Sequence, residues 1–321
     1  MGRLPCMHLE SAPVVLLPYP VEEIPGLPAG LEAHVFDGAL CDGRPGPPPA
    51  ALLARAELLV VPYMRTATVL PLLSAMPALR VVQTQTAGVD DIRPHVPAGV
   101  TLCNARGVHD ASTAELAVAL ALAALRDIPG FVRGQDAEQW RSGFYPALAD
   151  RTVLIVGYGS VGAAIEERLR PFECEVLRVA RTARQSPHGP VRALAELPAL
   201  LPTADLVILA VPLSEETRHL VDAGFLAAMP DGALLVNVAR GPVVDTGALL
   251  AELSAGRLRA ALDVTDPEPL PAGHPLWHAP GVLVTPHVGG SSSAFLPRAR
   301  RLIAAQLSRF AKGEPLENVI V

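Results

Sequence analysis

Three ionisable residues follow apolar, β-branched runs in the second half of the chain. Arg240 ends the run LLVNVAR, Glu268 lies between two prolines in DPEPLP, and His287 ends the run VLVTPH. Because the carboxyl ends of parallel strands form the ligand-binding edge of such sheets, we expect these residues to share a site. An arginine can orient a carboxylate and polarise a carbonyl. A histidine kept charged by a glutamate can give a proton to a developing alkoxide. The set suits hydride transfer to a 2-oxo acid.

Each of the three residues also has an ordinary alternative explanation when it is taken alone. Arg240 could cap a strand end, Glu268 could be a turn residue, and His287 could be a hydrogen-bonded core histidine. Because all three residues follow a nucleotide-binding signature in the chain, their occurrence together favours a shared functional site.

That signature is a glycine-rich motif near the middle of the chain, where residues 152–162 read TVLIVGYGSVG. Gly157 permits a tight turn, Gly159 allows a pyrophosphate to approach the backbone, and Gly162 lets the following helix pack on the strand. The N–H groups at the start of that helix attract phosphates. Strand, glycines and helix in this order predict a dinucleotide-binding fold. About 150 residues precede the motif, so a further domain comes first.

The residues after the second strand of this fold bear on the choice of cofactor. An acidic residue there usually binds the ribose 2′-hydroxyl. Here the strand expected at 175–180 ends in Ala180, and Arg181 and Thr182 follow. An arginine can pair with a 2′-phosphate, which predicts a preference for NADP(H), with NAD(H) possible. The alternative is that Arg181 is a solvated loop charge.

Short apolar strands alternate with helical stretches in both halves of the chain, which predicts βα units and parallel sheets. Ser112 and Glu115 are spaced as a capping box before a long apolar helix. Residues 131–150 read as a polar connection and 193–200 as a helix. We expect an α/β protein of two doubly wound parallel-sheet domains. A Rossmann dinucleotide-binding domain (105–288) is inserted in a flavodoxin-like substrate-binding domain (1–104 and 289–321), which the amphipathic tail at 293–311 rejoins.

The composition excludes several classes of protein. The chain has 321 residues, of which 50% are hydrophobic and 18% charged, so it can bury sizeable cores. A net charge of −6 and a pI near 5.9 mean that the chain has no excess of positive charge with which to bind nucleic acid or an anionic membrane. Four cysteines without a C-x-x-C indicate no metal site, and the N-terminus lacks a secretory signal, which favours a cytoplasmic location. Lys312 is the only lysine, which argues against Schiff-base chemistry.

The chain resembles the D-isomer-specific 2-hydroxyacid dehydrogenase family over nearly its whole length. The similar stretches are QTQTAGVDDI, STAELAVALALAALRDI, GYGSVG, NVARGPVVD, ALDVTDPEPLP with HPL, and TPHVGG. The resemblance implies that Arg240 anchors the substrate, that His287 is the acid/base and that Glu268 is its partner. It also implies that backbone N–H groups around Ala87, Gly88 and Val89 bind the substrate carboxylate.

The resemblance further implies a set of cofactor-binding residues in the glycine loop and after the later strands. They are Gly157, Tyr158, Gly159, Ser160, Val161, Gly162, Arg181, Thr182, Val211, Pro212, Val238, Ala239, Asp263 and Gly289, with Thr113 near the pyrophosphate. The family usually forms homodimers through the dinucleotide-binding domain. The expected partners are therefore a small 2-oxo or 2-hydroxy acid and a second copy of the chain, with no nucleic acid and no membrane.

Within the family, DVTDPEPLP with an arginine after the second strand is similar to glyoxylate/hydroxypyruvate reductases, which favour NADPH. Glutamate rather than glutamine at 268 argues against formate as the substrate, and alanine rather than lysine at 87 argues against phosphite. Two alternatives stay open: an NAD-dependent dehydrogenase of a larger biosynthetic D-2-hydroxy acid, and a nucleotide-sensing, corepressor-like binding protein. Arg65 either contacts a second anionic group of the substrate or is a solvated residue at a helix start.

Overall fold

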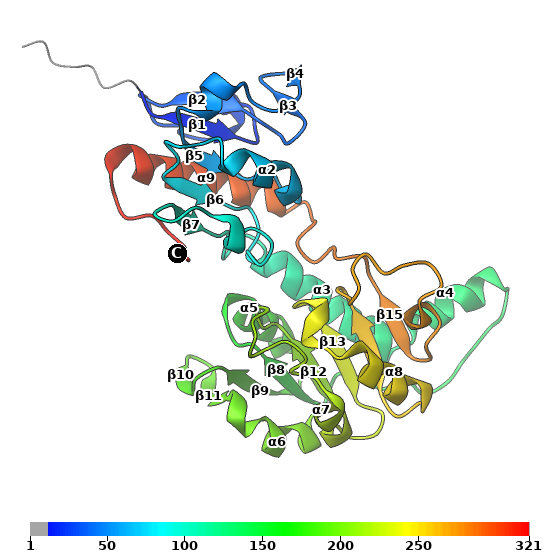
Figure 1. Ribbon diagram of the computed structural model, residues 1–321. Helices are drawn as coiled ribbons and strands as arrows, with labels where there is room; N and C mark the ends of the chain where they lie inside the picture. The colour runs from blue at the N-terminus through cyan, green and yellow to red at the C-terminus, as the bar shows by residue number, and fades with distance from the viewer. Residues whose placement is uncertain (1–11, 321) are drawn as a thin grey trace, which may run out of the picture. The chain divides into compact units, whose positions relative to one another are not determined.

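The computed structural model describes residues 12–320, which divide into two compact units. Within the described residues, unit 1 comprises 12–108 and 296–320, and unit 2 is the intervening His109–Phe295 (Figure 1). Each unit contains a parallel sheet with helices, so the expected α/β fold class is confirmed. No helix among residues 12–320 is long and apolar enough to cross a membrane.

Unit 1 is built on a five-stranded parallel sheet of order β2-β1-β5-β6-β7. Its elements are β1 (Val14–Leu17), β2 (Glu32–Val35), β3 (Leu40–Cys41), β4 (Arg44–Pro45), α1 (Ala50–Leu53), β5 (Ala56–Val60), α2 (Thr66–Leu73), β6 (Val81–Gln83), β7 (Thr101–Cys103) and α9 (Phe295–Lys312). Successive side chains of a strand point to opposite faces. Val14 and Leu16 pack with the apolar residues of α2, whereas Val15 and Leu17 pack with those of α9. The last helix of the chain therefore completes the core of its first hundred residues (red and blue in Figure 1).

Unit 2 is built on an eight-stranded sheet of order β10-β11-β9-β8-β12-β13-β14-β15, which is parallel except for the β10–β11 hairpin. Its elements are α3 (Asp110–Leu125), α4 (Ile128–Asp136), β8 (Thr152–Val156), α5 (Ser160–Leu169), β9 (Glu175–Ala180), β10 (Arg184–Ser186), β11 (Gly189–Ala193), α6 (Leu197–Leu200), β12 (Leu206–Leu209), α7 (Ala223–Ala228), β13 (Leu234–Asn237), α8 (Thr246–Ser254), β14 (Arg259–Leu262) and β15 (Val282–Val284). Val153 and Ile155 of β8 pack with α3 and α5, and Leu154 and Val156 pack with α7 and α8. Burial on both faces explains why these strands read as continuous apolar runs.

The expected capping box at Ser112 and Glu115 is wrong. Helix α3 begins at Asp110, and the residue before it, His109, makes no side-chain cap. Ser112 thus lies inside the first turn, and its hydroxyl lies 2.5 Å from the hydroxyl of Ser292. A tertiary partner has replaced the local cap that the spacing suggested.

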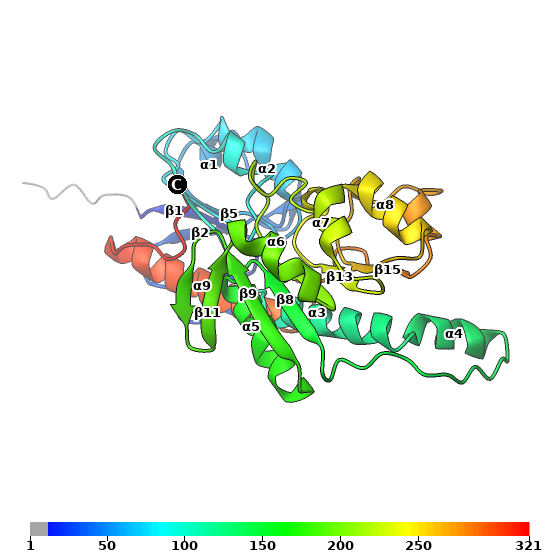
Figure 2. The ribbon, with the colours of Figure 1, turned by 90° about the horizontal axis from the view of Figure 1, so that it is seen from below.

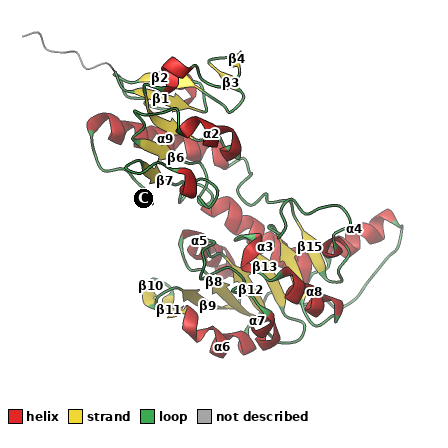
Figure 3. Ribbon diagram, viewed as in Figure 1, coloured by secondary structure: helices red, strands yellow, loops and turns green. Residues whose placement is uncertain are grey.

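Two stretches form elements that the sequence did not predict (Figure 3). Residues 131–150, expected to be only a connection, contain most of α4 and then an extended arm. Residues 184–193 form the β10–β11 hairpin, so the helix expected from 193 begins only at Leu197 as α6. The β10–β11 hairpin forms because β11 pairs with the edge of β9. The sequence gives little indication of these two short strands, because neither contains a long apolar run.

Candidate active site

His287 and Glu268 form a hydrogen-bonded pair, with 2.6 Å between the histidine Nδ1 and the carboxylate Oε1. The hydrogen bond from His287 lowers the pKa of Glu268, against the opposing effect of burial. Glu268 is therefore ionised at neutral pH, and it orients the imidazole. Because the pair uses Nδ1, the other ring nitrogen, Nε2, is the one that can exchange a proton with a substrate.

The turn that carries His287 is held by a buried carboxylate. Asp263 is 3% exposed, and it accepts hydrogen bonds from the Thr285 hydroxyl (2.6 Å) and from the backbone N–H groups of Val288 (2.9 Å) and Gly289 (2.8 Å). His287 has a left-handed backbone (φ +52°), and its N–H donates to the carbonyl of Asp263 at 2.8 Å. Both carboxylate oxygens of Asp263 are thus used inside the protein. Sequence analysis did not find this anchoring role.

Arg240 comes to the same edge of the sheet from the end of β13. Its side chain donates to the carbonyl of Ala239 at 2.8 Å, and its own carbonyl accepts from the Asn237 side chain at 3.0 Å. A Cβ atom on Gly241 would lie 1.8 Å from the Thr265 carbonyl oxygen, so only glycine lets the two chain segments pass. The charge of Arg240 contributes to the lowered pKa of Glu268. The structure therefore brings Arg240, Glu268 and His287 together.

The glycine loop has the shape that a dinucleotide needs. Gly157 has φ +104°, and a Cβ there would lie 2.4 Å from the Ala210 carbonyl carbon. A Cβ on Gly162 would lie 2.4 Å from the Gly157 carbonyl oxygen, whereas a Cβ on Gly159 would meet nothing within 4 Å. The first and third glycines are thus needed for packing, and the second leaves open space at the start of α5. These residues fit the pyrophosphate of a nicotinamide dinucleotide.

A buried polar network supports this loop from behind. Tyr158 (4% exposed) and Glu166 (3% exposed) are hydrogen-bonded to each other. Arg178 of β9 donates to the same carboxylate through Nε at 2.7 Å, and its guanidinium lies 6.0 Å from the centre of the Tyr158 ring. Arg184 donates to the Tyr158 carbonyl. Sequence analysis missed this network, although a glutamate on the core-facing side of α5 was a signal for it.

The other predicted cofactor residues lie at or beside the carboxyl edge of the unit 2 sheet. Arg181 and Thr182 are exposed just after β9, Val211 and Pro212 follow β12, and Val238 and Ala239 follow β13. Thr113 lies 3.6 Å from the position that a Cβ of Gly289 would take. Among residues 12–320 no three His, Cys, Asp or Glu side chains gather as a metal site.

The predicted carboxylate-binding residues belong to unit 1, where they follow β6. Their carbonyls are held by side chains: Asn104 donates to the Ala87 carbonyl at 2.7 Å, and Thr86 donates to that of Gly88 at 2.7 Å. Within the described part of the chain, the N–H groups of Ala87, Gly88 and Val89 donate to no other residue. The loop therefore offers backbone donors to an anion. Asn104, which holds it, is a residue that sequence analysis missed.

Arg65 has partners within unit 1. Its side chain packs on Gly38, where a Cβ would come within 2.7 Å of its Cδ. The N–H groups of Leu40 and Ala39 lower the pKa of Asp37, and the charge of Arg65 adds to this effect. Arg65 is exposed and directly precedes α2, at the helix start that the sequence predicts.

A Rossmann sheet with a dinucleotide-shaped glycine loop and an Arg–Glu–His set at its carboxyl edge defines an oxidoreductase of the nicotinamide-dependent class. Residues 118–289 match the family model described as "D-isomer specific 2-hydroxyacid dehydrogenase, NAD binding domain". The chain belongs to this family, as its motifs predicted, and it is an oxidoreductase that transfers hydride between a nicotinamide cofactor and a 2-hydroxy acid.

Relatives and solved structures agree with this assignment. The chain is 36% identical over 253 residues to a glyoxylate reductase of Thermofilum pendens, covering 75% of each chain. It is 32% identical over 310 residues to that of Aeropyrum pernix, covering 91% of this chain and 92% of the relative. A D-isomer specific 2-hydroxyacid dehydrogenase from Xanthobacter autotrophicus, solved with NADPH and MES, is similar with a TM-score of 0.78 and 30% identity, over 97% and 98% of the two chains. An NADPH-dependent glyoxylate/hydroxypyruvate reductase from Sinorhizobium meliloti is similar with a TM-score of 0.76 and 25% identity, over 97% of each chain.

Proposed function

We propose that the protein is an NADPH-preferring reductase of small 2-oxo acids, with glyoxylate and hydroxypyruvate as its class of substrate. The observation that carries the proposal is the 2.6 Å His287–Glu268 pair with Arg240 at the same edge of the sheet. Relatives named glyoxylate reductase, and the similar structures that contain NADPH or NADP, support the choice of substrate and cofactor.

In the proposed mechanism, Arg240 orients the substrate and polarises its 2-oxo group. The nicotinamide cofactor supplies a hydride when it is bound. His287 donates a proton from Nε2 to the oxygen as its negative charge develops, and Glu268 stabilises the charged imidazole before this transfer. Hydride and proton together convert C=O to CH–OH. In the oxidative direction His287 takes the hydroxyl proton.

Arg181 is proposed to set the preference for NADPH through a charge-assisted hydrogen bond to the 2′-phosphate. Arg181→Asp should lower kcat/KM for NADPH by about 10–100-fold, because such bonds contribute about 1.5–3 kcal/mol, while kcat/KM for NADH should hold or rise. The matched control is Arg192→Asp, which removes a half-exposed arginine of the neighbouring hairpin. An unchanged NADPH/NADH ratio in Arg181→Asp would show that Arg181 is only a solvated charge.

The first test of the function is the initial rate of loss of absorbance at 340 nm with NADPH and NADH separately. Glyoxylate, hydroxypyruvate, pyruvate, oxaloacetate and a branched 2-oxo acid are compared. Fast oxidation of NADPH with the two smallest substrates supports the proposal. Turnover of only a large substrate with NADH supports the biosynthetic alternative, and tight cofactor binding without turnover supports a nucleotide-sensing protein.

We also propose that the protein is a homodimer formed through unit 2. The arm after α4 leaves Trp140 97% exposed and Phe144 109% exposed. Figure 2 shows α4 continuing past the end of α3, with the returning chain beside it. Large aromatic side chains bury about 150–250 Å² each when covered, and patches of this kind mark interfaces. A second copy is the expected partner, in agreement with the dimers that the family resemblance implies.

A further inference from the structure

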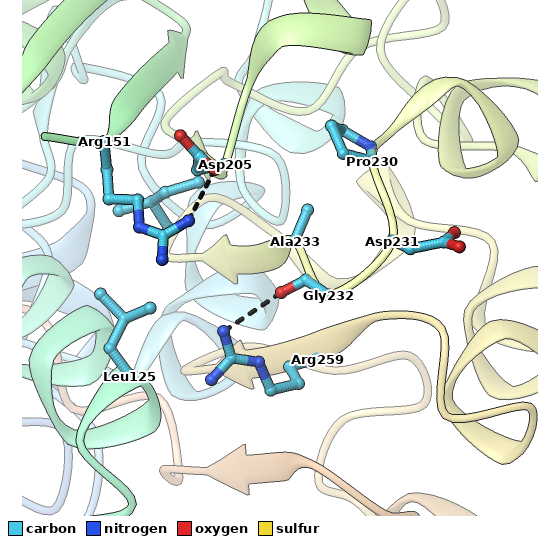
Figure 4. A pocket seen from close by; sticks show the side chains of 9 residues that line it. Leu125, Arg151, Asp205, Pro230, Asp231, Gly232, Ala233 and Arg259 are labelled. Atoms are coloured by element: carbon cyan, nitrogen blue, oxygen red, sulfur yellow. Dashed lines mark hydrogen bonds and ion pairs between the residues drawn. The ribbon is translucent and has the colours of Figure 1, made fainter. Parts of the chain in front are cut away.

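Unit 2 has a small hollow at the amino ends of its strands, on the edge opposite the one that holds His287. Its volume is about 50 Å³. It lies where β8, β12, β13 and β14 begin, next to the end of α3 (Figure 4). The lining residues are Leu125, Arg151, Asp205, Leu206, Pro230, Asp231, Gly232, Ala233 and Arg259. None of them belongs to the proposed catalytic or cofactor site, so the hollow is a separate feature.

Two arginines reach this hollow from different strands. Arg151, just before β8, donates to Asp205 at 2.9 Å. The other Asp205 oxygen accepts from the Thr152 N–H at 2.9 Å, so each oxygen of that carboxylate has a partner. Arg259, the first residue of β14, donates only to backbone carbonyls among the described residues. Its bonds are 3.1 Å to Gly232 and 3.4 Å to Ala124.

The positive charge of Arg259 therefore lacks a counter-ion within the described chain. Asp231 also lines the hollow, but its side chain is 87% exposed and pairs with Arg257 at 3.5 Å. Burial lowers the pKa of Arg259, and the nearby charge of Arg151 lowers it further. A guanidinium nevertheless stays charged in proteins. A half-buried charge beside a like charge, bonded only to neutral carbonyls, is an unfavourable arrangement unless an anion completes it.

We propose that this hollow binds a small monovalent anion, a halide or a compact oxyanion, between the guanidinium groups of Arg151 and Arg259. The volume of the hollow limits the size of the ligand. One water molecule needs about 10–15 Å³ by the same measure, so the hollow has room for only a few atoms. Chloride or nitrate fits, whereas a nucleotide or a sugar phosphate is too large. The bound anion accepts charge-assisted hydrogen bonds from both arginines and cross-links the amino ends of β8 and β14. The site stabilises unit 2 and takes no part in hydride transfer.

The site is tested by replacing chloride with an anion that is too large for it. The melting temperature of the full chain is measured in sodium chloride and in sodium gluconate at one ionic strength. Chloride at roughly ten times its Kd should raise the melting temperature by about 3–5 °C relative to gluconate. Crystals soaked in bromide should show anomalous density between Arg151 and Arg259. Neither measurement depends on enzymatic activity, so the outcome is independent of the proposed function.

Arg259→Gln and, separately, Arg151→Gln should each remove the chloride response and the bromide peak. The second variant guards against misfolding of the first, because Arg259 also supports the Gly232 loop. The matched control, Arg192→Gln, removes an exposed arginine of the same unit and should keep the full response. The proposal is wrong if the variants respond to chloride as the wild type does, if bromide is absent from the hollow, or if a carboxylate of a second copy fills it.

Discussion

At the scale of single residues, the Glu268–His287 pair determines how the reaction should depend on pH. The lowered pKa of Glu268 means that the carboxylate stays charged from neutral pH down to below its usual 4.5, so its protonation does not limit reduction above that pH. Glu268→Gln removes the negative charge beside the imidazole. The acid limb of the kcat/KM profile for reduction, which protonation of Glu268 produces in the wild type, should then be absent, because glutamine does not titrate.

This prediction is checked with full pH–rate profiles of the wild type and Glu268→Gln. His287→Ala provides the lower reference, since loss of a positioned acid/base costs about 10²–10⁴-fold in rate. A Glu268→Gln variant with a lower rate but an unchanged acid limb would show that Glu268 has only a structural role.

Arg240 should matter for the substrate and not for the cofactor. Arg240→Ala should lower kcat/KM for the 2-oxo acid by about 10²–10³-fold, because a charged hydrogen bond to the substrate and the polarisation of its carbonyl are both lost. Arg240→Lys keeps the charge without the planar fork and should recover only part of the loss. Cofactor affinity, followed by quenching of protein fluorescence, should stay near the wild-type value. Wild-type kcat/KM in Arg240→Ala would contradict the assignment.

At the scale of elements, the glycine loop and β9 are joined by the buried Tyr158–Glu166–Arg178 network. Burial alone would raise the pKa of Glu166, but hydrogen bonds from Arg178 and Tyr158 outweigh it and lower the pKa. Glu166→Gln leaves the guanidinium of Arg178, whose side chain is only 12% exposed, without a counter-charge, which should cost about 3 kcal/mol in the free energy of unfolding. Denaturation in urea, with an unchanged m-value, measures this cost.

The pH dependence of stability tests the same network. Since the folded pKa of Glu166 lies below its usual 4.5, its contribution is fully present above that pH and is lost as the pH falls through the lowered value. The difference in stability between the wild type and Glu166→Gln should therefore shrink in acid. The double variant Glu166→Leu with Arg178→Met should be more stable than Glu166→Gln, because it leaves no buried charge. Equal stability of the wild type and Glu166→Gln would rule out an energetic role for the ion pair.

At the scale of the whole molecule, the exposed arm predicts self-association. Trp140→Ser with Phe144→Ser should halve the mass measured by light scattering at micromolar concentration. The fold should survive, because neither side chain is covered within the chain. The matched control is Met64→Ser, which removes a 60% exposed apolar side chain of unit 1 and should leave the mass unchanged. A monomeric wild type, or a dimeric double variant, would contradict the proposal.

Much of the molecule could be read from the sequence because the relevant signals are local. The run at 152–162 encodes a buried strand, a glycine turn and a helix start, and each is set by burial and backbone geometry within a few residues. Polar residues at strand ends were found because parallel strands bring their carboxyl ends to one edge. Arg240, Glu268 and His287 therefore meet although they are far apart in the chain.

The tertiary structure decided whatever depends on partners distant in sequence. Asp263, which the sequence predicts to contact the cofactor, also anchors the His287 turn by accepting hydrogen bonds from Thr285, Val288 and Gly289. Ser112 bonds to Ser292 instead of capping α3, and the β10–β11 hairpin forms because β9 offers an edge. The uncompensated charge of Arg259 is visible only once the neighbours of its guanidinium are known. Local propensity determines elements, whereas burial and electrostatic pairing arise only when those elements pack.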